Sequence, residues 1–537
     1  MSRAREADSL ATILTFENRD AMSEWSMVWS TSNIPGMDNA AGGSFRSRMG
    51  RRKLRLGSLA LGALLTMHCR VSASALTGGF FLFLVFLIIA VVCLANPMRH
   101  FEVYLGQWSI NGPGRAFRIV PLLDGIGVAM CLNAIFRAIT CSCIAAIAVD
   151  YVLHAANDKT LPFTYCRRSL KSGAVIRKTV ELCNETNYCF DFYHNFTSFL
   201  NLIEYNVQMI WNNTPMWFLY VPWIWTAVLT FNALSHLSAT NTIPDIFRIN
   251  AKDIMEVPMY LAITDAFEIA LYTHSASVGT ELITGKGLNR YASGHIDPLL
   301  NRENVMHSGL ILLLISLNSV SALLCAFVDS QQRTDSADAA MHESTLWIFP
   351  MYSKCTSIGN YSHFMSTAIF SGLAFSYIVV AYILLKTALH TIFEYRVKLV
   401  FIERIVVGCL IVCCAMLSII FTTSGGLPLL ESMEAIMSGV TTKLICLLEL
   451  VAMLYVYGSH DFTSDLNLAM EETTCSSRIG YQLQIIPFIT IVIEVEMPTN
   501  FLLIGSIPLF CVLLALPLRA VHNAYTYLRP GNTNRNS

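Results

Sequence analysis

Charged side chains are scarce in this sequence, at 14% of 537 residues, whereas 54% of the residues are hydrophobic and the mean hydropathy is +0.51. A soluble chain of this length needs about 25% charged residues to cover the surfaces of its domains. The charges that are present fall in short stretches between apolar runs. The composition therefore excludes a soluble multidomain enzyme and predicts a polytopic membrane protein.

Three other features are missing. A formal charge of -1 provides no field to attract a polyanion, which argues against a nucleic-acid partner. The sequence has no HExxH motif, no CxxC pair and no paired aspartates at metal-ligand spacing, so we expect no membrane enzyme and no metal site. The first ~50 residues lack the apolar core and cleavage site of a secretory signal.

Residues 1–55 are instead predicted to form a disordered cytoplasmic tail. The tail is rich in polar residues and ends in a cluster of cations just before the first apolar run. By the positive-inside rule, this cluster places the N-terminus in the cytoplasm. Its members are Arg46, Arg48, Arg51, Arg52, Lys53 and Arg55.

Apolar stretches that approach the length of a membrane helix fill most of residues 56–525, which predicts an all-α transport-type domain followed by a short tail at 526–537. Charges interrupt the fifth stretch, and the tenth is shorter than a bilayer requires. The eleven stretches are 56–76, 78–99, 122–153, 216–237, 257–284, 306–328, 364–388, 400–422, 437–457, 482–497 and 500–520.

The one long hydrophilic insert, residues 154–215, combines non-membrane cysteines with glycosylation sequons. The cysteines are Cys166, Cys183 and Cys189, and the sequons begin at Asn184, Asn195 and Asn212. This combination is expected on an oxidising, glycosylating extracellular face, with Asn184 and Asn195 as the stronger glycan sites. Most other cysteines, such as Cys141, lie in apolar runs and are predicted to be small buried hydrophobes.

Several motifs, found in order along the chain, resemble those of the neurotransmitter:sodium symporter family. The most specific is a membrane Glu followed by an aromatic-Val-Tyr-Gly exit and an Asp-Phe turn. The motifs are FEVYLGQW (101–108), NGPGRAFRIVPLLDGIG (111–127), LPFTYC (161–166), NSVSALLCAF (318–327), TTSGGLPLLE (422–431) and ELVAMLYVYGSHDFTSDL (449–466).

The resemblance implies a plasma-membrane secondary transporter of a small amino acid or amine, in which two inverted five-helix repeats hold sodium and chloride sites where the first and sixth helices break. It also implies that Cys166 pairs with Cys183 or Cys189, and it leaves homo-oligomerisation open. Twelve helices are expected, but the chain passes almost directly from Leu237 to Ile243, so we expect the fifth helix to be missing and about eleven to be present.

The ion-ligand positions depart from the family pattern. Alignment of the family's first helix places Met67 at a sodium-ligating Asn, and a thioether is a poor ligand for a hard cation. In the eighth helix the family's Asp-Ser pair falls on Val380 and Ala381. Only Asn318 and Ser319 retain side chains that the family uses for sodium and chloride.

Charged and polar residues within the spans supply the remaining site candidates, because a charge in a membrane normally lines a cavity or pairs. Arg137 lies one turn before Cys141, which replaces the Tyr that closes over substrate in the family. Tyr272 and His274 join these two as substrate-pocket candidates. Glu268 falls at a chloride-contacting Gln and is the candidate for proton coupling, unless it forms a structural bridge with Arg137.

Two functional hypotheses follow. The first is a secondary transporter with altered or lost sodium coupling, in which sodium, chloride or a proton is the possible coupled ion. The second is a non-transporting relative that acts as a membrane binding or assembly partner. Preserved scaffold motifs together with lost ion ligands are compatible with both.

Overall fold

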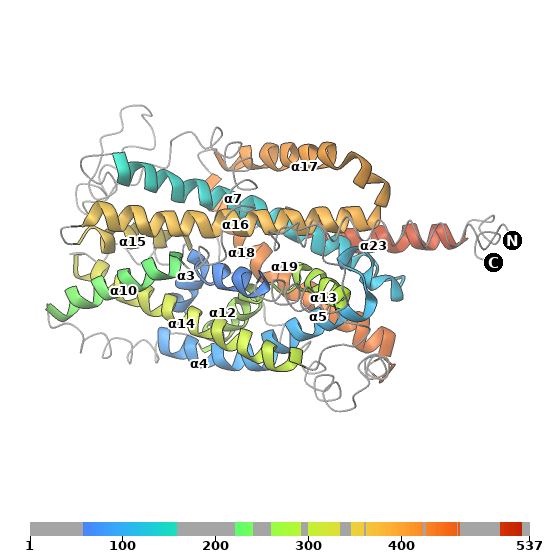
Figure 1. The fold of residues 1–537 in the computed structure, drawn as a ribbon, viewed down its shortest axis with the longest axis horizontal. Coiled ribbons are helices and arrows are strands. Elements are labelled where there is room, and N and C mark those ends of the chain that lie inside the picture. The colour runs from blue at the N-terminus through green and yellow to red at the C-terminus, as the bar shows by residue number, and fades with distance from the viewer. Residues whose placement is uncertain are drawn as a thin grey trace, which may run out of the picture.

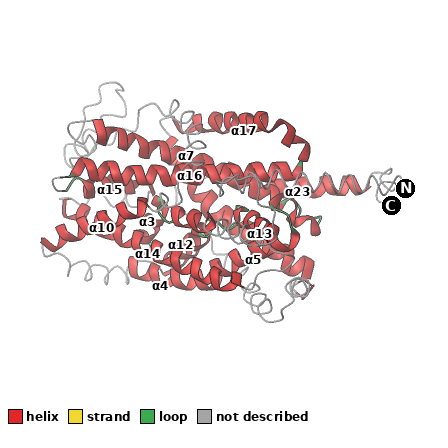
Figure 2. Cartoon of the chain, viewed as in Figure 1, coloured by secondary structure: helices red, strands yellow, loops and turns green. Residues whose placement is uncertain are grey.

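The computed structural model describes residues 57–157, 221–239, 259–291, 299–332, 345–358, 361–422, 426–458, 460–461 and 505–528. These residues form helices and connecting loops, with no strand among them (Figure 2). The predicted tail 1–55, most of the insert 154–215, the stretch 482–497 and the junction after Leu237 lie outside the described residues.

The principal helices follow the apolar runs of the sequence. They are α3 (Cys69–Thr77), α4 (Phe80–Ala90), α5 (Asn96–Ser109), α6 (Pro113–Ala116), α7 (Ile126–Asn157), α10 (Val221–Ala239), α12 (Met259–Thr273), α13 (Thr280–Tyr291), α14 (Leu299–Gln332), α15 (Ile348–Thr356), α16 (Ser362–Tyr395), α17 (Glu403–Ser418), α18 (Gly426–Ala435), α19 (Thr441–Leu450) and α23 (Ile507–Leu528). Short π-helical or 3₁₀ segments join several of them: η1 (Val91–Ala95), η2 (Phe117–Ile119), η6 (Thr345–Trp347), η7 (Val397–Ile402), η8 (Ile419–Thr422), η9 (Ile436–Val440) and η10 (Val451–Gly458).

Within the described residues, seven helices are long and apolar enough to cross a membrane, or eight if the bent pair Gly57–Leu65 and α3 counts as one span. The seven are Phe80–Ser109, Ile126–Ala156, Asn304–Val328, Ser362–Tyr395, Val397–Thr422, Leu429–Gly458 and Ile507–Tyr525. The predicted stretches at 216–237 and 257–284 correspond to α10 and to the interrupted pair α12 and α13. The all-α polytopic membrane fold predicted from the sequence is therefore confirmed.

The long helices α7 and α16 lie side by side along the bundle, and α17 runs outside them (Figure 1). The span containing α17 is apolar on all sides, and only 11% of its most hydrophobic window is buried. Ile405, Val412 and Met416 on this helix are all at least 60% exposed. In a bilayer such a surface faces lipid, which costs nothing for an apolar side chain.

Two glycines bring α5 and α13 into backbone contact. A Cβ at Gly106 would collide with the backbone of Leu282, and a Cβ at Gly285 would collide with that of Val103. Small residues allow helices to approach this closely in membranes. The contact holds the start of α13, and therefore the interruption before it, against the buried carboxylate of Glu102.

Candidate functional site

The first membrane helix is interrupted between Leu65 and Cys69, where the chain bends by 51°. An interruption leaves backbone groups without an intrahelical partner. In membrane proteins with broken helices, these groups are the usual ligands of ions and substrates. Here Asn318 of α14 donates from Nδ2 to the Thr66 carbonyl at 2.9 Å and to Ser72 Oγ at 3.0 Å. The amide of Asn318 therefore satisfies an exposed carbonyl and links the two halves of the helix to α14.

Helix α16 supplies two further contacts to the interruption. Ser376 Oγ donates to a carbonyl of the first half-helix at 2.7 Å, and the Cys69 N–H donates to the Tyr377 hydroxyl at 2.9 Å. Both side chains lie one turn before Val380 and Ala381, which the sequence alignment had placed at the ion site. Ser376 and Tyr377 are thus the residues of α16 that hydrogen-bond to the backbone on the two sides of the break.

The second interruption separates α12 from α13. Ser275 and Ser277 have φ values of 51° and 63°, and Gly279 has a φ of 87°. Two non-glycine residues in the left-handed region represent backbone strain of the kind that concentrates at functional sites. Glu102 of α5 stabilises this segment by accepting the Ser277 N–H at 2.8 Å.

Three of the predicted pocket residues come together between the two interruptions. The Arg137 guanidinium lies over the Tyr272 ring, 4.6 Å from its centroid, and the Tyr272 hydroxyl hydrogen-bonds His68 Nδ1 at 2.5 Å. The His68 ring in turn stacks on Tyr377 at 3.8 Å. Cys141 lies one helical turn from Arg137, and both are buried.

Arg137 is the unusual member of this group. Its side chain is only 3% exposed, and it makes no ion pair with any residue that the structure describes. Its Nη1 atom has no hydrogen-bond partner among those residues either. Among the described residues, its specific side-chain contact is the Tyr272 ring, and a cation–π contact replaces only part of the hydration that a buried guanidinium loses.

Glu268 belongs to a separate cluster of charges. Its carboxylate is paired with Arg70 of α3 and with Lys443 of α19, whose Nζ lies 2.9 Å from Oε2. Arg70 also reaches Glu434 of α18 through Nη1 at 3.1 Å. A Cβ at Gly439 would lie 2.6 Å from the Glu268 carboxyl carbon, so this glycine makes room for the carboxylate. The structure therefore pairs Glu268 with Arg70 and Lys443, and not with Arg137.

Two predicted candidates are placed elsewhere. His274 hydrogen-bonds the Ala270 carbonyl through Nδ1 at 2.8 Å and Ser308 of α14 through Nε2 at 3.2 Å, so its contacts are with α14 and its own helix. Ser319 donates to the Ile315 carbonyl of its own helix at 2.8 Å. Neither side chain has a contact with Arg137 among the contacts of the described residues.

Sequence reasoning missed Ser376, Tyr377, Lys443 and Glu434. Lys443 carried a signal, since it is a lone cation inside the predicted stretch 437–457 and in-span charges indicate sites or pairs. Among the described residues, no group of three or more His, Cys, Asp or Glu side chains is arranged to hold a metal ion. The cysteines and sequons of the insert 154–215 that were predicted to form a disulfide and carry glycans lie outside the described residues.

The space beside the first interruption is small. A cavity of about 10 Å³ lies among Met67, Asn318 and Tyr352, and α10 and α16 close its other sides. That volume is at the lower limit for a single water molecule. The conformation is therefore closed at this point, and an organic solute would have to displace the surrounding helices to enter.

Comparisons with known proteins agree on one family. The model of the sodium:neurotransmitter symporter family matches residues 73–213. The mouse sodium- and chloride-dependent neutral and basic amino acid transporter B(0+) is 36% identical over 89 residues, which cover 17% of this chain and 14% of the relative. The bovine sodium-dependent dopamine transporter is 32% identical over 97 residues, which cover 18% of this chain and 13% of the relative.

The human B(0+) transporter matches in the same way, with 35% identity over 89 residues and 13% of its own length covered. The matched segments thus span about one seventh of the relatives. The segment that the family model matches includes α5, whose Glu102 stabilises the second interruption, and α7, which carries Arg137. Over residues 73–213, this all-helical membrane chain is therefore similar to the sodium:neurotransmitter symporter family.

Proposed function

We propose that this chain is a secondary-active membrane transporter for a small solute that carries a carboxylate, such as an amino acid, with sodium coupling altered or lost. Two interrupted helices that meet in the middle of an apolar bundle are the arrangement in which such folds bind their substrates. The relatives named above are transporters of amino acids or of dopamine. Residues 1–55 would lie in the cytoplasm and the insert 154–215 outside the cell.

The observation that carries this proposal is the unpaired, buried Arg137 beside Tyr272. A charge at the centre of a membrane helix costs roughly 2.5–3.5 kcal/mol on insertion scales and therefore normally faces a partner or a cavity. Since no described carboxylate pairs with Arg137, an anionic group on the solute is the missing partner. Arginine suits this role because its planar fork binds a carboxylate through two hydrogen bonds.

The same charge selects between the two classes of solute that the family resemblance left open. An amine without a carboxylate would bring a second cation next to the guanidinium, and the two would repel each other. An amino acid offers its carboxylate to Arg137, and its ammonium group then lies farther away. The proposal therefore favours amino acids over simple amines.

The proposed loss of sodium coupling rests on the first interruption. Met67 offers a thioether where a hard oxygen ligand is needed, and a thioether is a poor match for a hard cation. Asn318 presents N–H groups to the Thr66 carbonyl, so that carbonyl already has a donor. Ser376 engages another carbonyl of the same helix. A sodium ion would have to break these hydrogen bonds before it gained its ligands.

Uptake into proteoliposomes tests the proposal. The purified full chain is reconstituted, and the uptake of radiolabelled neutral, acidic and basic amino acids is compared with that of the corresponding decarboxylated amines. We expect uptake of at least one amino acid and none of its amine. Arg137→Gln should abolish that uptake, whereas Lys398→Gln, an exposed charge change at one end of the bundle, should not alter it. Wild-type uptake by Arg137→Gln would contradict the role of Arg137.

A second candidate function, a non-transporting binding or assembly partner, is favoured by the packing at the first interruption. Side chains of α14 and α16 occupy the freed backbone groups, and the adjoining cavity measures about 10 Å³. If the chain is correctly inserted and folded but shows neither uptake nor solute-induced thermal stabilisation with any of these solutes, the non-transporting function is supported and transport is rejected.

A further inference from the structure

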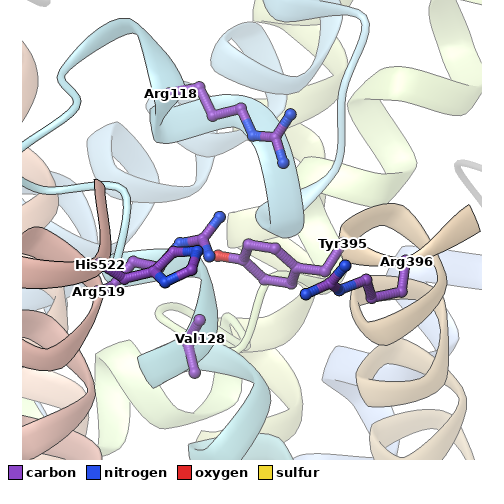
Figure 3. Close-up of a pocket in the computed structure, with 6 residues that line it drawn as sticks. All are labelled: Arg118, Val128, Tyr395, Arg396, Arg519 and His522. Atoms are coloured by element: carbon purple, nitrogen blue, oxygen red, sulfur yellow. The ribbon is translucent and has the colours of Figure 1, made fainter. Parts of the chain in front are cut away.

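A basic pocket lies at one end of the bundle, apart from the interrupted helices. Its volume is about 340 Å³, and Figure 3 shows its cations gathered around the ring of Tyr395. The lining comes from the segment before α7, from α7 itself, from the end of α16 and from α23. The lining residues are Arg118, Val128, Tyr395, Arg396, Arg519 and His522.

One wall of the pocket is held rigidly. Arg519 of α23 donates from Nε to Asp124 Oδ2 at 2.9 Å, and its guanidinium lies 5.1 Å from the centroid of the Tyr395 ring. The Tyr395 hydroxyl donates to the Asp124 carbonyl at 3.1 Å. Asn523 ties the same helix to the Pro121 carbonyl at 2.9 Å. Arg519 is thus held in place by the hydrogen bond of its Nε atom, and its two Nη groups remain as donors for a ligand.

The pocket carries an excess of positive charge. The carboxylate of Asp124, only 3% exposed, balances Arg519 alone. Arg118 and Arg396 are exposed and make no ion pair with any residue in the described part of the chain. With histidine neutral, the lining therefore has a net charge of about +2. That charge matches a phosphate monoester, which carries about −1.5 to −2 at pH 7.

The position of the pocket adds a second reason. Tyr395 is the last residue of one membrane span, Val128 lies in the first turn of another, and Arg519 and His522 lie near the end of a third. The pocket is therefore at the level where a membrane helix leaves the hydrocarbon and meets lipid headgroups. Arg115 and Arg118 lie in the loop that the positive-inside rule assigns to the cytoplasmic face, where anionic lipids concentrate.

We infer that this pocket binds a phosphate monoester, as presented by the headgroup of a phosphoinositide or by a free phosphorylated solute. The Arg forks would hold the phosphate oxygens through paired N–H donors, which is the geometry that guanidinium groups provide for phosphate. The site is independent of the proposed transport function. Because the ligand would contact α23 together with the ends of α7 and α16, it would also fix the outermost helix to the bundle.

The test uses the full chain in nanodiscs. One set contains phosphatidylcholine with 5 mol% phosphatidylinositol 4,5-bisphosphate, a second the same molar charge as phosphatidylserine, and a third phosphatidylcholine alone with soluble inositol trisphosphate or inorganic phosphate added. Ligand binding is read from bound lipid in native mass spectrometry and from the thermal unfolding midpoint. The double variant Arg118→Gln/Arg396→Gln is compared with Lys398→Gln, an exposed cation two residues from Arg396 that does not line the pocket.

We expect the phosphoinositide, but not phosphatidylserine, to bind and raise the midpoint, and the double variant to bind about 30-fold more weakly. Lys398→Gln should bind within about twofold of wild type, because Lys398 does not line the pocket and salt screens its exposed charge. Binding of the soluble phosphates with similar strength would identify a free solute as the source, and binding only in the lipid set would identify the headgroup. Equal effects of the double variant and Lys398→Gln, or equal binding of phosphatidylserine, would overturn the inference.

Discussion

The buried pair between Glu268 and Lys443 offers the sharpest test of the described charge network. Glu268 is 13% exposed and Lys443 is 8% exposed, so both are largely removed from solvent. Replacing the carboxylate by an amide, Glu268→Gln, leaves Lys443 without its ion-pair partner. Arg70 is less affected, because Glu434 still pairs with it at 3.1 Å.

The expected loss of stability comes from Lys443, because Arg70 keeps a partner and Lys443 does not. Removing one partner of a buried ion pair costs about 3–5 kcal/mol, because the other charge stays buried and uncompensated. Removing both charges avoids this cost. We therefore expect Glu268→Gln to lower the free energy of unfolding by about 3–5 kcal/mol. The double variant Glu268→Gln/Lys443→Met should regain about 2 kcal/mol of that loss, a coupling within the range measured for residues in one network.

Unfolding in mixed micelles, titrated with a denaturing detergent and followed by tryptophan fluorescence, measures these differences. Asp461→Asn is the control, since this side chain is 72% exposed and its loss should change the free energy by less than about 0.5 kcal/mol. A Glu268→Gln variant that unfolds at the wild-type midpoint would refute the pairing. Failure of the double variant to regain stability would show that Lys443 is not the stranded charge.

Three other outcomes are expected. Raising sodium at constant ionic strength against choline should produce no saturable thermal stabilisation, and saturation at millimolar sodium would show that a sodium site survives. Glycosidase should increase the gel mobility of chain made in a secretory cell, and the shift should disappear in Asn184→Gln/Asn195→Gln; an unchanged mobility of the wild type would contradict the predicted orientation. Glu394→Gln should cost about 3–5 kcal/mol by detergent titration, because this carboxylate accepts Lys286 Nζ at 2.6 Å and two backbone N–H groups; a loss below about 1 kcal/mol would argue against that pairing.

Hydropathy was sufficient to locate the seven spans found among the described residues, since a span must be apolar over about 20 residues wherever it lies in the bundle. The predicted stretch 400–422, for example, corresponds to the span Val397–Thr422. The interruptions required more than hydropathy. The first one contains neither glycine nor proline between Leu65 and Cys69, so only the resemblance to a family indicated that the helix would break there.

Register within a uniformly apolar helix could not be predicted. Helix α16 has few polar landmarks, so the sequence did not indicate that Ser376 and Tyr377 would be the side chains that hydrogen-bond to the first interruption. The sequence also could not predict which charged residues, far apart in the chain, form ion pairs. Arg70 and Glu434 are 364 residues apart, and which of several in-span charges meet depends on how the helices pack. Arg137 was predicted to be a site candidate as an in-span charge, and only the structure shows that no described carboxylate pairs with it.

The ion pairs of Glu268 also bear on whether a proton could be the coupled ion. Protonation of Glu268 would break its ion pairs with both Arg70 and Lys443; Arg70 would keep Glu434 as a partner, but Lys443 would be left as a buried, unpaired cation. A carboxylate that serves as a proton carrier must change its protonation state in every cycle, so its cationic partners would have to separate from it in every cycle as well. The cluster connects α3, α12 and α19, and such a separation would move three helices together. Glu268 therefore fits a structural bridge better than a proton carrier.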